Sequence, residues 1–137
     1  SVRLADEVYR DLRLAAQYDD LLAAPIEDAR ANVGDYAPAA KDLAELSAKY
    51  ANMKTSDLPN PTFAAVVDSA KTTFYWGAEA MATKIGLIDQ EDARAESDLE
   101  TQRASFTENW MTTATSLKQV TEALDVPYTT DLEGPHE

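Results

Sequence analysis

Apolar residues recur at helical spacing in four stretches of this chain. In the first stretch they are separated by three or four positions, from Leu4 through Leu22 to Val33. This spacing places them on one side of an α-helix. The pattern keeps its register through Pro25, although an interior proline normally kinks or ends a helix. We therefore predict one continuous first helix that bends near Pro25 and stops at Gly34.

A second helix is predicted from the residues that follow Asp35. Asp is a preferred residue type at a helix N-cap, and a proline such as Pro38 is tolerated in a first helical turn. On the helix surface, Glu45 and Lys49 stand four positions apart and are expected to form an ion pair. The polar segment 54–60 then connects this helix to the next. Its inner face is predicted to consist of Tyr36, Ala39, Leu43, Leu46, Tyr50 and Met53.

Two further helices are predicted on either side of a short turn. The third begins at Asn60 and Pro61 and ends near Gly86. Asp89 is expected to cap the fourth, which runs to about Asp125. Because the turn between them is short, the two helices should be antiparallel neighbours. Their inner faces contain Phe63, Val67, Ala70, Phe74, Gly77, Met81, Ile85 and Ile88, followed by Leu99, Phe106, Trp110, Leu117, Val120 and Leu124.

These elements predict an all-α fold, namely an antiparallel up-down-up-down four-helix bundle with a kinked first helix and a long fourth helix. A chain of 137 residues fits a single domain. We expect the bundle to cover residues 1–125 and a C-terminal tail to cover 126–137. The longest apolar runs, such as 21–24, are far shorter than the ~18 residues that a membrane-spanning helix needs. No membrane span is therefore expected in this chain.

The charge balance narrows the range of partners. The chain has 12 Lys and Arg residues against 25 Asp and Glu residues, which gives a formal net charge of −13. Nucleic acid binding needs a basic surface, so we expect no nucleic acid partner. Anionic membrane surfaces are disfavoured for the same reason.

Residue types that perform catalysis or bind metals are scarce. The chain has no cysteine, and its only histidine is His136 in the tail. Glu133 and His136 have the Glu-x-x-His spacing of di-iron bundles, but Gly134 and Pro135 lie between them, so no helical face can present both. We expect no enzyme, no cofactor and no metal site. The acidic run of Asp89, Glu91, Asp92, Glu96, Asp98 and Glu100 lacks the pattern of a calcium loop and is interpreted as a solvated helix start, with a cation site as the alternative.

One face of the third predicted helix is small and uncharged where a solvated face should carry charge. The charged residues Asp68, Lys71, Glu79 and Lys84 are expected on its flanks. This helix is therefore predicted to be contacted on two sides. Either the tail or the bent end of the first helix covers the neutral face, or a protein partner uses its aromatic residues as anchors. The remaining alternatives are a small ligand at this face and a tryptophan that is simply exposed. The candidate partner interface consists of Tyr75, Trp76, Ser69, Thr72, Thr73, Ala80 and Thr83.

The leading functional interpretation is a non-enzymatic protein-interaction module, an accessory subunit that docks on a larger and possibly membrane-bound assembly. The alternative is the ligand-sensing four-helix-bundle ectodomain of a bacterial receptor. The chain opens at Ser1, directly inside a helical pattern. We interpret this as a removed leader or anchor, or as a piece of a longer protein, and expect an extracytoplasmic location on the cell-envelope side.

Overall fold

The described part of the chain is built from α-helices and two short 3-10 turns, without a β-strand. The computed structural model describes residues 2–58, 60–123 and 134–135. The all-α class predicted from the sequence is confirmed for these residues. The elements are α1 (Val2–Gln17), α2 (Asp19–Ala23), α3 (Ile26–Ala31), η1 (Val33–Asp35), α4 (Tyr36–Ala51), η2 (Thr55–Asp57), α5 (Pro61–Asp89) and α6 (Ala93–Ala123).

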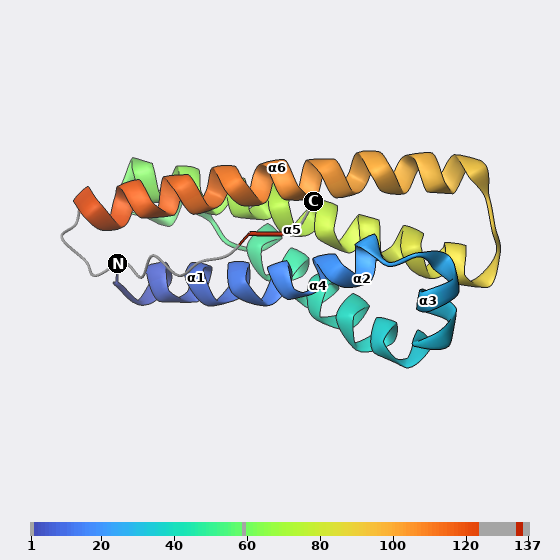
Figure 1. Ribbon diagram of the computed structural model, residues 1–137. Helices are drawn as coiled ribbons and strands as arrows, with labels where there is room; N and C mark the ends of the chain where they lie inside the picture. The colour runs from blue at the N-terminus through green and yellow to red at the C-terminus, as the bar shows by residue number, and fades with distance from the viewer. Residues whose placement is uncertain (1, 59, 124–133, 136–137) are drawn as a thin grey trace.

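The helix α5 lies at the centre of the packing. Figure 1 shows α5 and α6 side by side along most of the length of the molecule, with α3 at one end. The contact between α5 and α6 is the most extensive in the molecule, the contact between α4 and α5 comes next, and α5 also touches α1. The expectation that this helix is contacted on two sides is therefore confirmed.

The first predicted helix is broken rather than bent. The helix α2 ends at Ala23, and Ala24 and Pro25 both adopt extended backbone, with φ and ψ of −59° and 139° for Ala24 and −56° and 149° for Pro25. The ring of a proline disfavours the helical conformation in the residue before it. The helix α3 then continues in a new direction (Figure 1), and Val33, predicted to face inward, is 56% exposed. The prediction of one continuous helix is wrong.

The caps of the two longest helices follow simple side-chain chemistry. Asn60 accepts a hydrogen bond from the backbone N–H of Thr62 at 2.8 Å, which confirms the predicted start of α5. The helix passes through Gly86 and ends at Asp89, so the predicted stop at Gly86 is wrong. Asp92, not Asp89, caps α6, because its Oδ1 accepts two backbone N–H groups of the first turn at 2.9 and 3.2 Å.

Most of the side chains predicted to face inward form one core. Trp110 of α6 is 1% exposed, and its indole Nε1 donates to the backbone carbonyl of Leu12 in α1 at 2.8 Å. Met53, Ile85 and Leu99 are only partly buried against this core. Leu124 lies outside the described residues. The core includes Val8, Leu12, Leu22, Tyr36, Leu43, Leu46, Tyr50, Phe63, Val67, Phe74, Met81, Phe106, Trp110, Leu117 and Val120.

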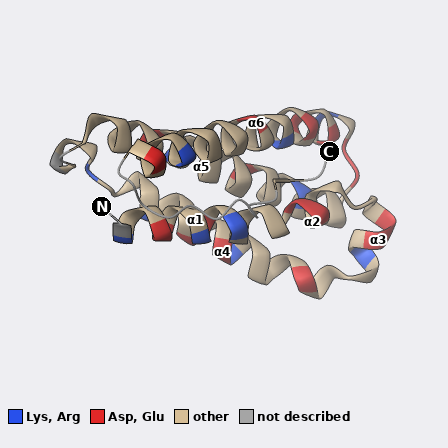
Figure 2. Ribbon diagram, turned by 60° about the vertical axis from the view of Figure 1, so that its left-hand side comes forward, with Lys and Arg blue, Asp and Glu red and all other residues tan. Residues whose placement is uncertain are grey.

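Charge is distributed unevenly over the helices (Figure 2). The helix α3 carries acidic and basic residues and the connection between α5 and α6 carries acidic ones, whereas long stretches of α5 carry no charged residue. This difference follows from the position of α5 between its neighbours, because a charged side chain is costly to bury without a partner. In the ranges that the structure describes, none of the helices has both the length and the apolar character needed to cross a membrane.

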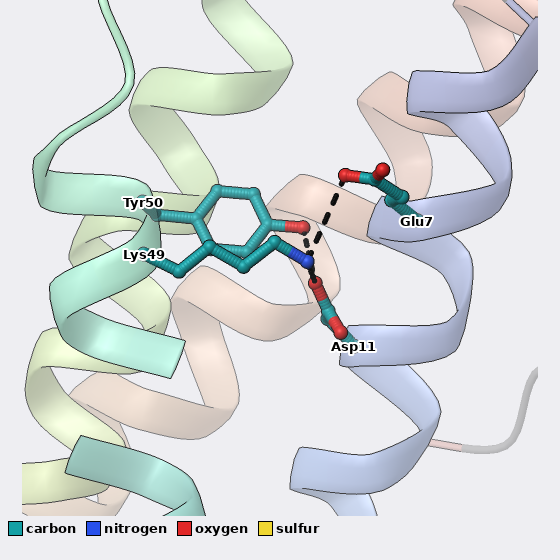
Figure 3. Close-up of polar contacts among 4 residues, drawn as sticks. All are labelled: Glu7, Asp11, Lys49 and Tyr50. Carbon is teal, nitrogen blue, oxygen red and sulfur yellow. Dashed lines mark hydrogen bonds and ion pairs between the residues drawn. The ribbon is translucent and has the colours of Figure 1, made fainter. Parts of the chain in front are cut away.

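A polar cluster joins α1 to α4 (Figure 3). The carboxylate of Asp11 accepts hydrogen bonds from the ammonium of Lys49 and from the hydroxyl of Tyr50, each at 2.7 Å. Glu7, one turn earlier in α1, lies 3.7 Å from the same ammonium. Lys49 of α4 therefore forms ion pairs with two residues of α1, and the predicted ion pair with Glu45 of its own helix does not form.

Candidate functional site

Two of the seven residues predicted to form a partner interface are buried. Thr73 and Ala80 have no exposed surface. Thr73 Oγ1 lies 3.0 Å from Thr113 Oγ1 of α6, in the middle of the contact between the helices. One turn away, a Cβ built on Gly77 would lie 3.1 Å from the ring of Phe106. The small face of α5 thus packs closely against α6, and the prediction of an exposed strip is wrong at Thr73 and Ala80.

The other five residues of the predicted interface lie at or near the surface. Tyr75 is 48% exposed and Thr72 is exposed, while Ser69, Trp76 and Thr83 are half-buried. The rings of Tyr75 and Trp76 meet edge to face, with centroids 5.0 Å apart and an angle of 78°. The hydroxyls of Thr72 and Thr83 donate to backbone carbonyls of their own helix at 3.4 and 3.1 Å. What remains of the strip is a compact aromatic pair with small neighbours.

The described part of the tail contacts α6. A Cβ built on Gly134 would lie 3.1 Å from the sulfur of Met111 and 3.1 Å from the ring of Trp110. Gly134 and Pro135 therefore do not support the alternative in which the tail covers Trp76. Glu133 and His136, the two ends of the Glu-x-x-His spacing, lie outside the described residues.

A second site, which was not predicted, is a groove of about 600 Å³ between α2, α5 and α6. One face of α6 forms its longest wall, because the lining residues of this helix recur every three or four positions from Glu96 to Met111. The wall mixes apolar and charged side chains. The lining consists of Leu22, Ala23, Lys84, Glu96, Leu99, Glu100, Arg103, Ala104, Thr107, Glu108 and Met111.

Lys84 is the most unusual residue of this groove. It is 3% exposed, and its ammonium donates to the backbone carbonyls of Leu22, at 3.2 Å, and Ala24. These carbonyls lie where α2 breaks before Pro25, so Lys84 caps the end of that helix. Burial, followed by the charge of Arg103, lowers the pKa of the Lys84 ammonium. Lys84 was expected on a flank of the neutral face of α5, and the structure buries it instead.

Lys84 has no acidic partner within the described ranges, whereas the second cation of the groove does. Arg103 donates from Nε and Nη2 to the two carboxylate oxygens of Asp19, at 2.9 and 2.8 Å. Asp19 is fully buried, so this bidentate pair balances its charge inside the protein. The ion pairs of the described residues include no carboxylate bound to Lys84. The wall of the groove therefore carries one buried positive charge in excess.

The acidic run at the start of α6 does not assemble into a metal site in the described part of the chain, where no group of three His, Cys, Asp or Glu side chains is arranged to hold an ion. Its members are exposed. Glu91 lies 3.6 Å from Arg30 of α3, so one acid of the run forms an ion pair with another helix.

Comparisons with protein-family models, with curated proteins and with solved structures find no match to this chain. The groove was not predicted from the sequence, because its lining comes from three distant parts of the chain, around residues 22, 84 and 96–111. Two signals were present in the sequence. Lys84 follows Met81 by three positions in a mostly apolar helix, and the face from Glu96 to Met111 contains both charged and apolar residues.

Proposed function

We propose that this chain is a non-enzymatic ligand-binding domain and that its site is the groove between α2, α5 and α6. The observation that carries the proposal is the buried ammonium of Lys84, which lines the groove without an acidic partner among the described residues. A buried cation without a counter-charge is costly, and the anionic group of a ligand would supply that charge. The groove volume of about 600 Å³ lies within the range of about 300–1,000 Å³ that is usual for small-molecule sites.

The proposal takes the four long helices as an antiparallel up-down-up-down bundle, with a ligand held between helices. The order of contacts supports this arrangement. Thr73 meets Thr113 and Gly77 approaches Phe106, so positions that rise along α5 fall along α6. In this form the chain corresponds to the ligand-sensing ectodomain considered from the sequence, and an extracytoplasmic location belongs to the same proposal.

The lining of the groove supports binding rather than catalysis. The described residues that line it include no histidine or cysteine, and its three glutamates are exposed. Lys84 already donates to two backbone carbonyls, so its amino group is held by the fold and is not free to act as a nucleophile.

The proposal is tested by blocking the groove without removing a polar contact. Ala104 is an exposed groove residue of α6, and Ala44 is an exposed residue of α4 outside the groove. Ala104→Trp should fill the groove, while Ala44→Trp serves as the matched control. Isothermal titration and thermal melts would be run with a panel of small carboxylates and amino acids that carry apolar groups.

We expect members of this panel to bind the wild type and the Ala44→Trp variant, and to raise their melting temperatures. Binding to the Ala104→Trp variant should be lost. If no compound binds the wild type, or if both variants bind equally well, the groove is not a ligand site.

A protein partner at Tyr75 and Trp76 is the second candidate function, as in an accessory subunit docked on a larger assembly. The specific observation in its favour is that Tyr75 remains 48% exposed while its ring is held against Trp76. Aromatic residues fixed in this way often contribute a large share of interface energy. This candidate uses a different face of α5 from the one that carries Lys84, so the two sites can be tested separately.

A further inference from the structure

The groove lining contains basic side chains that are mostly buried and acidic side chains that are exposed. Lys84 is buried, and the side chain of Arg103 is 24% exposed. Glu96, Glu100 and Glu108 are all exposed along the same face of α6. None of these three glutamates forms an ion pair within the described ranges. The positive charges thus lie deeper in the groove than the negative charges.

The spacing along α6 brings the two signs close together. A helix rises about 1.5 Å per residue, so the three positions from Glu100 to Arg103 correspond to about 4.5 Å along the axis. Residues three and four apart also share a face. A small ligand in the groove can therefore contact an acidic and a basic side chain at the same time.

A ligand with a single charge fits this arrangement poorly. An anion approaching Lys84 passes three exposed carboxylates in a protein whose formal net charge is −13. A cation attracted by the glutamates would leave the charge of Lys84 unbalanced and would be repelled by it. A molecule with one charge of each sign avoids both conflicts, because each end meets its opposite.

Apolar surface completes the description of the ligand. Leu22 and Leu99 line the groove, and Met111 at its edge is 51% exposed. Leu22 is already buried, so an apolar group that covers Leu99 or Met111 would remove the remaining apolar surface from water, which is favourable by about 25 cal/mol per Å².

We infer that the groove binds a zwitterion of the amino-acid class with an apolar side chain, its carboxylate on Lys84 and its ammonium on one of the exposed glutamates of the α6 wall, Glu96, Glu100 or Glu108. This inference rests on the proposed function and names the ligand class of the same site. The apolar side chain lies against the nearer of Leu99 and Met111.

The experiment compares ligands that differ by one charge. Leucine, N-acetyl-leucine, which lacks the ammonium, and leucine methyl ester, which lacks the carboxylate, are titrated into the chain by calorimetry. Leucine should bind at least about tenfold more tightly than either derivative, because one charge-assisted hydrogen bond contributes about that factor. The titration is repeated with phenylalanine and its two derivatives, so that the side-chain size does not decide the result.

Two triple variants with the same net charge locate the ammonium. E96Q/E100Q/E108Q removes the three glutamates of the groove. E27Q/E45Q/E122Q removes three exposed glutamates that do not line it. The first variant should weaken leucine binding by about tenfold or more, while the second leaves it unchanged.

The outcomes separate the two proposals. If the N-acetyl derivatives bind as tightly as the free amino acids, and E96Q/E100Q/E108Q strengthens their binding, the groove is a simple anion site. That result overturns the zwitterion inference, while the proposed function stands. If the methyl esters bind as tightly as the free amino acids, the carboxylate contact with Lys84 is refuted. If none of the six compounds binds the wild type, the zwitterion inference is overturned. The proposed function would still be supported if other members of the carboxylate panel bind the wild type and do not bind Ala104→Trp.

Discussion

Arg103 holds the buried carboxylate of Asp19 through two hydrogen bonds, from Nε to Oδ1 at 2.9 Å and from Nη2 to Oδ2 at 2.8 Å. The two residues are 84 positions apart in the chain and join α2 to α6. Asp19 has no exposed surface, whereas Arg103 reaches the groove. Because the carboxylate is the deeper partner, it depends on the guanidinium for its counter-charge.

Removing the guanidinium should therefore destabilise the fold. Arg103→Met leaves the carboxylate of Asp19 buried without a partner, and we expect the free energy of unfolding to fall by about 3–5 kcal/mol. Urea denaturation followed by circular dichroism measures this loss. The double variant Asp19→Leu/Arg103→Met, which removes both charges, should lose much less. Equal losses in the single and double variants would show that an unpaired carboxylate is not the cause.

The two tryptophans should differ in their contribution to stability. Trp110 is fully packed and hydrogen-bonded to Leu12, so Trp110→Ala should lower the free energy of unfolding by about 3–5 kcal/mol. Trp76 is only partly buried, and Trp76→Ala should cost clearly less. Denaturant melts of the two variants measure both values. Similar losses would mean that Trp76 is a core residue and would weaken the case for a partner surface around it.

Alkaline pH should weaken the contact between Tyr18 and Asp42. Burial, followed by the hydrogen bond to Asp42, raises the pKa of the Tyr18 hydroxyl from 10.0 to about 12. A raised folded-state pKa stabilises the fold fully below the unfolded pKa, and this contribution is lost as the pH rises through the folded pKa. The free energy of unfolding should therefore fall between about pH 10 and 12 more steeply in the wild type than in Tyr18→Phe.

Denaturant melts at a series of pH values, together with the absorbance of the phenolate, measure this effect. Tyr50 supplies a second comparison, because burial and then the hydrogen bond to Asp11 raise the pKa of its hydroxyl as well. Superimposable pH profiles of the wild type and both phenylalanine variants would contradict the expected linkage.

The aromatic pair on α5 makes a separate prediction about partners. Tyr75→Glu places a charge on an exposed position, so the fold should keep its helicity while binding through this face is lost. Trp76→Glu should have the same effect on binding, with some loss of stability because Trp76 packs partly against the core. Co-purification of bound proteins with the wild type and the two variants, with circular dichroism as the control, decides the matter. Retention of every partner by Tyr75→Glu would show that Tyr75 and Trp76 do not form a partner-binding surface.

Hydrophobic spacing was sufficient to predict the helices and most of the core. Phe74, Phe106 and Trp110 are buried as predicted, because the apolar side of a long amphipathic helix faces the core. The break at Pro25 was not predictable from spacing alone. The stripe keeps its register through the break, and the carbonyls that the break leaves free are satisfied by Lys84, which is 60 and 62 positions away in the chain.

The surface was harder to predict than the core. A neutral face made of Thr73, Ala80 and their neighbours fits either a docking surface or a close contact between helices, and only the position of α6 distinguishes the two. The groove depends on side chains from three helices, so no local pattern marks it. Lys84 was expected on a flank of the neutral face, and lysine is rarely buried, but here it is buried where it caps a broken helix.

The hydroxyls of Thr73 and Thr113 set the register between the two longest helices. Sliding α5 along α6 by one helical turn, about 5.4 Å, separates these hydroxyls from their distance of 3.0 Å and moves the ring of Phe106 away from Gly77. Apolar contacts are not directional and would oppose such a slide only weakly. The small residues of α5 that were predicted to form a docking surface thus help to fix how two helices of 29 and 31 residues align along each other.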